Sequence, residues 1–331
     1  MEKIVPDITR SLSDGFMNDL KKSVLYPLLE RVQQDHTLML AIRKNCINIY
    51  YRGGNILRVK AKSDGSYSAF FDEKYNQSIN SPIPQLPNII RNQKDSEKWV
   101  GALQNLKLIM DSYFSTVKSE LEREFQQLIA RENNFSSKKR KSGYGYYIAD
   151  IEFNTGIEFE DKTLSARFDI LAVQRLVKQR KFRPALIEMK YGDDSLNNDS
   201  GIIKHLEDLD KFIKNEKKYN ALLETMESQF CQLKELGLME EDSDRADIKI
   251  TKDEKPEVIC ILANHNPRSP ILRDQILKNQ EIDRFANSLN YDLKFFVSSF
   301  AGFSLHPSCM FSLNEFKELG SKFFWRSTTG K

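Results

Sequence analysis

The sequence lacks any run approaching the roughly 20 consecutive apolar residues that cross a bilayer as a helix. Its first residues also lack the basic and then apolar pattern of a secretion signal. The chain has 331 residues, of which 40% are hydrophobic and 29% charged, a balance typical of globular proteins. We therefore expect a cytoplasmic protein without membrane association, folded as one large domain or two ordinary ones.

Cysteine is scarce, and the chain has no glycine-rich loop of the kind that binds nucleoside triphosphates. Its four cysteines lie far apart without the spacing of metal ligands, which indicates free thiols and no zinc site. Neither sign of charge is in large excess, because the chain has 50 basic and 47 acidic residues and a net charge of +3. A surface for nucleic acid would therefore have to be a local patch.

The first third of the chain predicts helices and a small antiparallel sheet. Apolar positions repeat with helical period over residues 12–36, with a bend near Pro27, and again over residues 95–133, with an interruption near Asp111. Two strands are expected on either side of Gly53 and Gly54, followed by a third extended segment. We expect residues 1–115 to form an N-terminal helical and β-rich region that could help to bind a substrate.

The rest of the chain alternates strands and helices, which indicates an α/β domain over residues 116–331. A capping box at Ser312 and Glu315 predicts the start of its last helix, and Gly320 its end. The expected strands lie near residues 147, 167, 185, 257 and 293, and the expected helices begin at residues 200, 269 and 312.

Three charged residues lie within the apolar strands of this domain: Asp169, Glu188 and Lys190. A charge in a buried strand is costly unless it is paired or binds a metal. Because side chains alternate along a strand, Glu188 and Lys190 point to the same face. If the strand of Asp169 pairs alongside, two carboxylates converge and repel each other unless a cation lies between them. Hard oxygen ligands of this type favour Mg²⁺ or Mn²⁺.

The spacing of Phe168-Asp169 and Glu188-Met189-Lys190 resembles the PD-(D/E)XK nuclease superfamily, which has a restriction-endonuclease-like fold. The resemblance covers roughly residues 115–265. It implies a mixed sheet flanked by helices, in the order helix, three strands, helix and strand. It also implies that Asp169 and Glu188 bind Mg²⁺ or Mn²⁺ and that Lys190 helps to activate water, so that these three residues are catalytic.

Two further glutamates compete to complete the metal site. The superfamily often adds a glutamate from the first helix, and the resemblance implies Glu124 for this role, with Glu122 and Glu132 as competitors. Glu152 is a candidate from its own strand, where alternation places it with Asp150 and opposite four apolar or aromatic side chains. Glu152 could be a metal ligand or could face solvent. Those four are Tyr147, Ala149, Ile151 and Phe153.

Two segments are candidates for substrate binding. The first is a basic loop whose four consecutive cations stand beside tyrosines, a composition that suits phosphate contact and base stacking. Its cations are Lys138, Lys139, Arg140 and Lys141. The second is the start of the helix near residue 200, where Lys204 and His205 could hold a phosphate or orient a water. We expect the other three histidines, His36, His265 and His306, to be ordinary residues.

Together these features predict a metal-dependent endonuclease or exonuclease that hydrolyses phosphodiester bonds, with DNA as the expected substrate. The alternative is a nucleic-acid-binding or assembly module that keeps the fold without cleavage. Hydrolysis of RNA or another phosphate ester is a further alternative, since metal chemistry alone does not separate the substrates. Cutting both strands of a duplex would favour two active sites and hence a homodimer.

Overall fold

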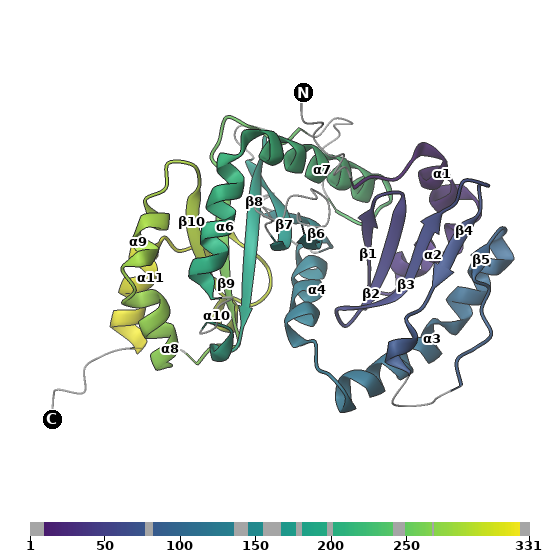
Figure 1. Ribbon diagram of the computed structural model, residues 1–331, viewed down its shortest axis with the longest axis horizontal. Helices are drawn as coiled ribbons and strands as arrows, with labels where there is room; N and C mark the ends of the chain where they lie inside the picture. Colours follow the sequence, from purple (N-terminus) through teal and green to yellow (C-terminus); the bar gives the residue numbers. More distant parts are fainter. Residues whose placement is uncertain are drawn as a thin grey trace, which may run out of the picture. The chain divides into compact units, whose positions relative to one another are not determined.

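A computed structural model shows a mixed α/β protein, whose described residues form two five-stranded sheets. Figure 1 shows how the elements follow one another along the chain. The structure describes residues 10–76, 82–135, 145–154, 167–176, 181–196, 201–240, 249–266 and 268–324. No helix in these ranges is long and apolar enough to span a bilayer. The chain divides into two compact units. The N-terminal unit comprises Thr9–Lys138 and Ser228–Arg245, and the second unit comprises the described parts of Lys139–Glu227 and Ala246–Lys331.

The N-terminal unit contains an antiparallel sheet in the order β1-β2-β3-β4-β5, with helices that precede and follow it. The predicted helix over residues 12–36 is two helices, which separate just before Pro27. The strands are β1 (Leu38–Arg43), β2 (Cys46–Tyr51), β3 (Gly54–Ala61), β4 (Tyr67–Phe70) and β5 (Ile89–Ile90). The helices are α1 (Asp14–Lys22), α2 (Tyr26–Gln34), α3 (Gln93–Thr116) and α4 (Leu121–Asn134).

Two features of this unit differ from the sequence-based expectation. The long helical pattern breaks after Thr116, and not near Asp111, and a second helix begins at Leu121. The unit also extends to Lys138 and so includes α4, whereas we expected the second domain to begin at residue 116. α4 belongs to this unit because the side chain of Gln127 hydrogen-bonds the hairpin between β2 and β3.

That hairpin turns tightly at Arg52 and Gly53. Tyr51 pairs with Gly54, so that two residues form the loop, and both have positive φ angles of 49° and 76°. These angles match a type I′ turn, whose twist suits a two-residue hairpin. The predicted pair of strands at this position is therefore confirmed. The backbone N–H of Gly53 donates to Oε1 of Gln127 at 2.8 Å, which fixes the turn against α4.

Replacing Gly53 with alanine should destabilise the N-terminal unit by about 2 kcal/mol through steric overlap and backbone strain. A Cβ atom at this position would lie 2.5 Å from Cβ of Arg123 and 2.7 Å from the backbone nitrogen of Glu124. Gly65→Ala is the matched control, because Gly65 also has a positive φ of 80° but nothing lies within 4 Å of its Cβ position. Urea unfolding should show a cost of about 1 kcal/mol for the control. Equal costs for the two variants would contradict close packing of the turn.

The second unit contains a mixed sheet in the order β10-β9-β8-β7-β6. β6, β7 and β8 pair antiparallel, whereas β8, β9 and β10 run parallel. This confirms the expected mixed sheet with alternating strands and helices. The strands are β6 (Tyr146–Asn154), β7 (Arg167–Leu176), β8 (Lys181–Tyr191), β9 (Glu257–Ala263) and β10 (Asp292–Val297).

Helices of this unit lie beside the mixed sheet (Figure 1). Ser312 and Glu315 form the predicted capping box, since each side chain accepts from the other residue's backbone N–H. α11 ends at Leu319 with Gly320 as its C-cap, as predicted, and a π-helical turn then continues from Gly320 to Phe324. The helices are α6 (Ile202–Lys214), α7 (Glu216–Glu235, shared with the N-terminal unit), α8 (Pro270–Leu272), α9 (Glu281–Ala286), α10 (Ser298–Ala301) and α11 (Leu313–Leu319).

Candidate active site

The antiparallel pairing of β7 and β8 brings Asp169 and Glu188 together. Ile170 pairs with Ile187, so Asp169 and Glu188 follow as the next pair of positions along the two strands. The Oδ2 atom of Asp169 accepts a hydrogen bond from the backbone N–H of Met189 at 2.8 Å, which ties this carboxylate to β8. Both carboxylates are 4% exposed. The buried strand pair thus holds two acidic side chains at neighbouring positions.

Glu188 is the centre of a buried charged cluster. Its Oε1 atom lies 2.9 Å from Nζ of Lys190 and 3.0 Å from Nδ1 of His205, which reaches it from the first turns of α6. Burial alone would raise the pKa of the Glu188 carboxyl. The hydrogen bond from His205 and the positive charge of Lys190 outweigh burial and hold that pKa below its usual range. Glu188 is therefore ionised at neutral pH, with a cation beside it.

Arg167 and Glu152 border the two carboxylates. The guanidinium of Arg167 lies 2.6 Å from Oε2 of Glu152. Partial burial opposes the charge of Arg167, but attraction to Glu152, Asp169 and Glu188 raises the pKa of the guanidinium above its ordinary value. The structure therefore brings Glu152 near the candidate site through Arg167. Its role as a metal ligand stays a prediction.

A β-bulge in β6 changes the expected alternation of side chains. Tyr147 pairs with Val173 and Asp150 with Leu171, because Ala149 is an extra residue without a partner on β7. Tyr147 and Asp150 consequently point to the same face, which corrects the prediction that they point to opposite faces. Glu152 has a positive φ of 53°, which is uncommon for a residue with a side chain. Both irregularities occur where β6 passes the acidic pair.

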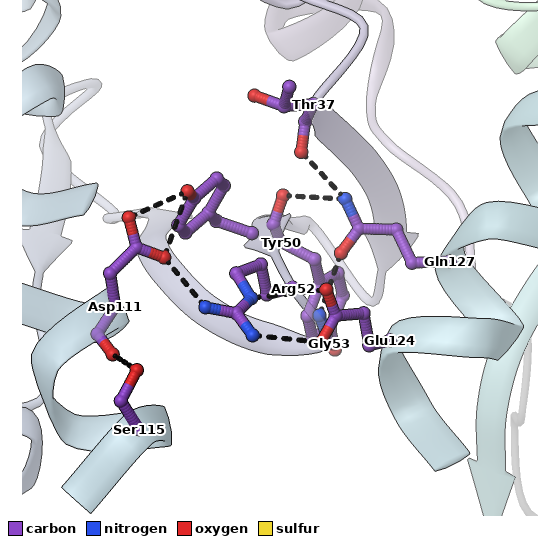
Figure 2. Close-up of polar contacts among 9 residues, drawn as sticks. Thr37, Tyr50, Arg52, Gly53, Asp111, Ser115, Glu124 and Gln127 are labelled. Carbon is purple, nitrogen blue, oxygen red and sulfur yellow. Dashed lines mark hydrogen bonds and ion pairs between the residues drawn. The ribbon is translucent and has the colours of Figure 1, made fainter. Parts of the chain in front are cut away.

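Glu124 has its partner in the N-terminal unit (Figure 2). Nε of Arg52 donates to one oxygen of Glu124 at 3.1 Å, and a terminal nitrogen donates to the other at 3.3 Å. The same guanidinium donates to Asp111 at 2.9 Å. Glu124 and Gln127 lie one turn apart on α4, so both face the hairpin. Within the N-terminal unit, Glu124 thus holds Arg52. Its role as a metal ligand stays a prediction.

The structure places the two competing glutamates on α4 and brings one of the predicted substrate contacts, His205, to Glu188. Glu132 lies 2.9 Å from Arg131 on the same helix, and Glu122 lies in the first turn of α4. Lys204 forms an exposed pair with Asp208 at 2.6 Å, whereas its neighbour His205 contacts Glu188. The basic loop lies outside the described residues, and with it Lys138, Lys139, Arg140 and Lys141.

His265 is a residue that sequence reasoning set aside as ordinary. Its ring is buried, with Nδ1 3.0 Å from Oδ1 of Asp193 and Nε2 3.1 Å from the backbone oxygen of Lys190. His265 thereby fastens the end of β8 to the turn η4 (Asp193–Leu196). Its place in the sequence was the available signal, because His265 comes two residues after the end of β9, and β9 ends beside the end of its parallel neighbour β8.

Asp169 and Glu188 suit a hard divalent cation that takes only one or two ligands from the protein. In the part of the chain that the structure describes, no three His, Cys, Asp or Glu side chains gather closely enough to hold a metal ion by themselves. Mg²⁺ does not require such a cage, since it retains several waters and uses one or two carboxylates together with substrate phosphates. Asp169 and Glu188 would supply these carboxylates.

Comparison with known protein families, with curated proteins and with solved structures finds no match for this chain. The geometry of the site therefore carries the functional argument.

Proposed function

We propose that this protein is a metal-dependent nuclease with a restriction-endonuclease-like core that hydrolyses phosphodiester bonds in DNA. The observation that carries the proposal is the buried cluster of Asp169, Glu188 and Lys190 on two paired strands. Two acids and an amine buried next to one another on paired strands are costly unless they serve a purpose such as binding a cation. The element order α4, β6, β7, β8, α6 and β9 also supports the proposal, because it is the order implied by the resemblance.

The residues of the cluster have distinct roles in the proposed reaction. Asp169 and Glu188 would hold Mg²⁺ or Mn²⁺, which supplies an acidified water and neutralises charge on the phosphate. Nζ of Lys190, beside Glu188, can orient the attacking water and stabilise the extra negative charge of the transition state. His205 fixes the Glu188 carboxylate from a second side. In this reaction water would add to phosphorus and release a proton to solvent, the P–O bond to the leaving group would break, and the leaving oxygen would take up a proton from solvent.

Removal of divalent metal tests this proposal. The purified chain should cleave labelled single-stranded, duplex or plasmid DNA with Mg²⁺ or Mn²⁺, and excess EDTA should stop the reaction because two carboxylates alone would remain at the site. Restoring Mg²⁺ should restore cleavage. If the chain binds DNA but cleaves it under none of these conditions, the alternative of a nucleic-acid-binding module without catalysis is favoured. Cleavage of matched RNA in preference to DNA would contradict the proposed substrate.

A further inference from the structure

One face of the β1–β5 sheet carries cations and aromatic rings. On β3, Arg58 and Lys60 are exposed, whereas the alternate residues Leu57 and Val59 are fully buried. On β4, Phe70 is 54% exposed. We call this surface the cationic–aromatic face, and its members are Tyr50, Arg58, Lys60, Ser68 and Phe70.

Strand pairing places the members of this face side by side. Arg58 pairs with Phe70 and Lys60 pairs with Ser68, so each cation has its β4 neighbour on the same face. On the other side of β3, Arg58 pairs with Asn48, two residues from Tyr50 on β2. The two cations lie roughly 7 Å apart along β3. One face therefore presents two cations, with Phe70 beside Arg58 on β4 and Tyr50 near Arg58 on β2.

The two cations of β3 have neutral neighbours. Nε of Arg58 donates to Oδ1 of Asn48 at 3.2 Å, and Lys60 pairs across the strands with Cys46 and Ser68. Within the described ranges, neither Arg58 nor Lys60 is ion-paired with a carboxylate. Burial raises the pKa of the Cys46 thiol, but the positive charges of Arg58, Arg43 and Lys60 oppose that shift. The positive charges of Arg58 and Lys60 therefore act on the same region of the sheet as Cys46.

The rings of the face are also positioned for contact. The hydroxyl of Tyr50 accepts hydrogen bonds from Nδ2 of Asn48 at 3.1 Å and from Arg43 at 3.3 Å, which limits rotation of its side chain. Exposure of more than half of Phe70 leaves apolar ring surface in water, a state that stacking with another ring relieves. A preformed arrangement of this type loses little conformational entropy on binding.

We propose that the cationic–aromatic face binds single-stranded DNA, with Arg58 and Lys60 on phosphates and Phe70 stacked on a base. Unpaired bases expose the ring faces that such stacking needs, whereas a duplex keeps them inside its own stack. The choice of DNA rests on the proposed function. The binding itself requires neither the metal site nor cleavage.

Binding of a fluorescent 20-nucleotide oligo(dT) in EDTA tests the face, measured by anisotropy at several salt concentrations with the full chain. Arg58→Glu combined with Lys60→Glu should weaken binding by at least about 30-fold. The double variant should also lower the salt dependence by about 1.4 in log–log slope, or about 0.7 for each lost phosphate contact. Lys94→Glu combined with Lys98→Glu is the matched control, because it makes the same charge change on α3 and should alter affinity less than threefold.

Phe70 provides an independent measurement. Phe70→Ala should weaken binding by about tenfold, within the range of one lost base stack. Phe70→Trp should bind like the natural chain, and its added fluorescence should be quenched by oligo(dT). Circular dichroism and thermal unfolding of each variant would show whether it is folded, so that the tryptophan variant remains informative if the charge reversal does not fold.

Several outcomes would contradict binding of single-stranded DNA by the cationic–aromatic face. They are unchanged affinity after the Arg58 and Lys60 reversal, equal losses in the α3 control, no quenching of Phe70→Trp, and tighter binding of duplex DNA or of RNA than of oligo(dT). Metal-dependent cleavage that survives such a result would leave the proposed nuclease intact. Conversely, suppose that the chain binds oligo(dT) through Arg58, Lys60 and Phe70 but does not cleave DNA. That result would support binding by the cationic–aromatic face and reject the proposed nuclease.

Discussion

Asp169→Asn should lower metal-dependent DNA cleavage by at least about 100-fold, a loss comparable with removal of one strong electrostatic contact to a transition state. Asparagine keeps the size of the side chain but loses the negative charge that would hold the cation. In the natural chain the Met189 N–H donates to Oδ2 of Asp169 at 2.8 Å. The amide oxygen of asparagine can still accept this hydrogen bond, so the pairing of β7 and β8 should persist. Single-turnover cleavage of labelled DNA in Mg²⁺ measures the loss.

Lys190→Met should cause a loss of similar size for a different reason. The variant retains the apolar stem but removes the amine that lies 2.9 Å from Glu188. Lys181→Met is the matched control, because Lys181 begins the same strand but is 42% exposed and pairs with Asp253. The control should cleave DNA within about twofold of the natural chain, as expected for an exposed lysine far from the cluster. Full activity in either Asp169→Asn or Lys190→Met would reject the proposed mechanism.

Lys107→Met should destabilise the N-terminal unit by about 3 kcal/mol, because it leaves Asp35 without its closest cation. Nζ of Lys107 lies 2.6 Å from Oδ2 of Asp35 and 2.7 Å from Oγ1 of Thr37, and the lysine side chain is 9% exposed. The ammonium also stands 5.1 Å from the ring centre of Tyr51. Unfolding in urea, followed by circular dichroism, measures the change.

The same pair predicts a dependence of stability on pH. Burial opposes ionisation of Asp35, but hydrogen bonds from Lys107 and Thr37 and the lysine charge outweigh it and lower the pKa of the carboxyl. A lowered folded-state pKa stabilises the protein above the unfolded value near pH 4, and that stabilisation disappears as pH falls through the folded value. Lys107→Met should therefore flatten the loss of stability below about pH 4.

Lys98→Met is the control for both measurements. Lys98 lies on the same helix as Lys107, but it is 63% exposed and 3.9 Å from Asp95. Its removal should change the free energy of unfolding by less than about 0.5 kcal/mol. Equal effects of the two substitutions would show that the buried pair contributes no more than a surface pair.

A second network in the N-terminal unit explains why Arg52 occupies an unusual backbone conformation. Its guanidinium joins Asp111 of α3 to Glu124 of α4 (Figure 2). The hydroxyl of Tyr51 also donates to Asp111. Burial and the contact with Asp111 raise the pKa of the Tyr51 hydroxyl to about 12, so this donor keeps its proton at neutral pH. The positive φ of Arg52 is thus offset by contacts to two helices.

Local patterns in the sequence determined much of the fold. Apolar periodicity predicted the strands β7, β8 and β9, and turn chemistry predicted the hairpin at Gly53. The Ser312 capping box also needs only neighbouring residues, and it is present. These features could be predicted because each depends on interactions within a few residues of the chain. The same alternation rule correctly placed Glu188 and Lys190 close enough to form an ion pair.

The tertiary structure decided which charges meet. Glu124 and Glu152 were rival candidates in the sequence. In the structure, Glu124 of α4 pairs with Arg52, and Glu152 of β6 pairs with Arg167. His265 contacts the Lys190 carbonyl across 75 positions of the chain, a partnership that no local pattern contains. Strand order and helix facing set such contacts through packing of distant segments. The sequence alone indicated that Asp169, Glu188 and Lys190 lie on buried strands and named His205 as a candidate near them. Only the folded chain showed that His205 contacts Glu188 and that Arg167 pairs with Glu152 beside them.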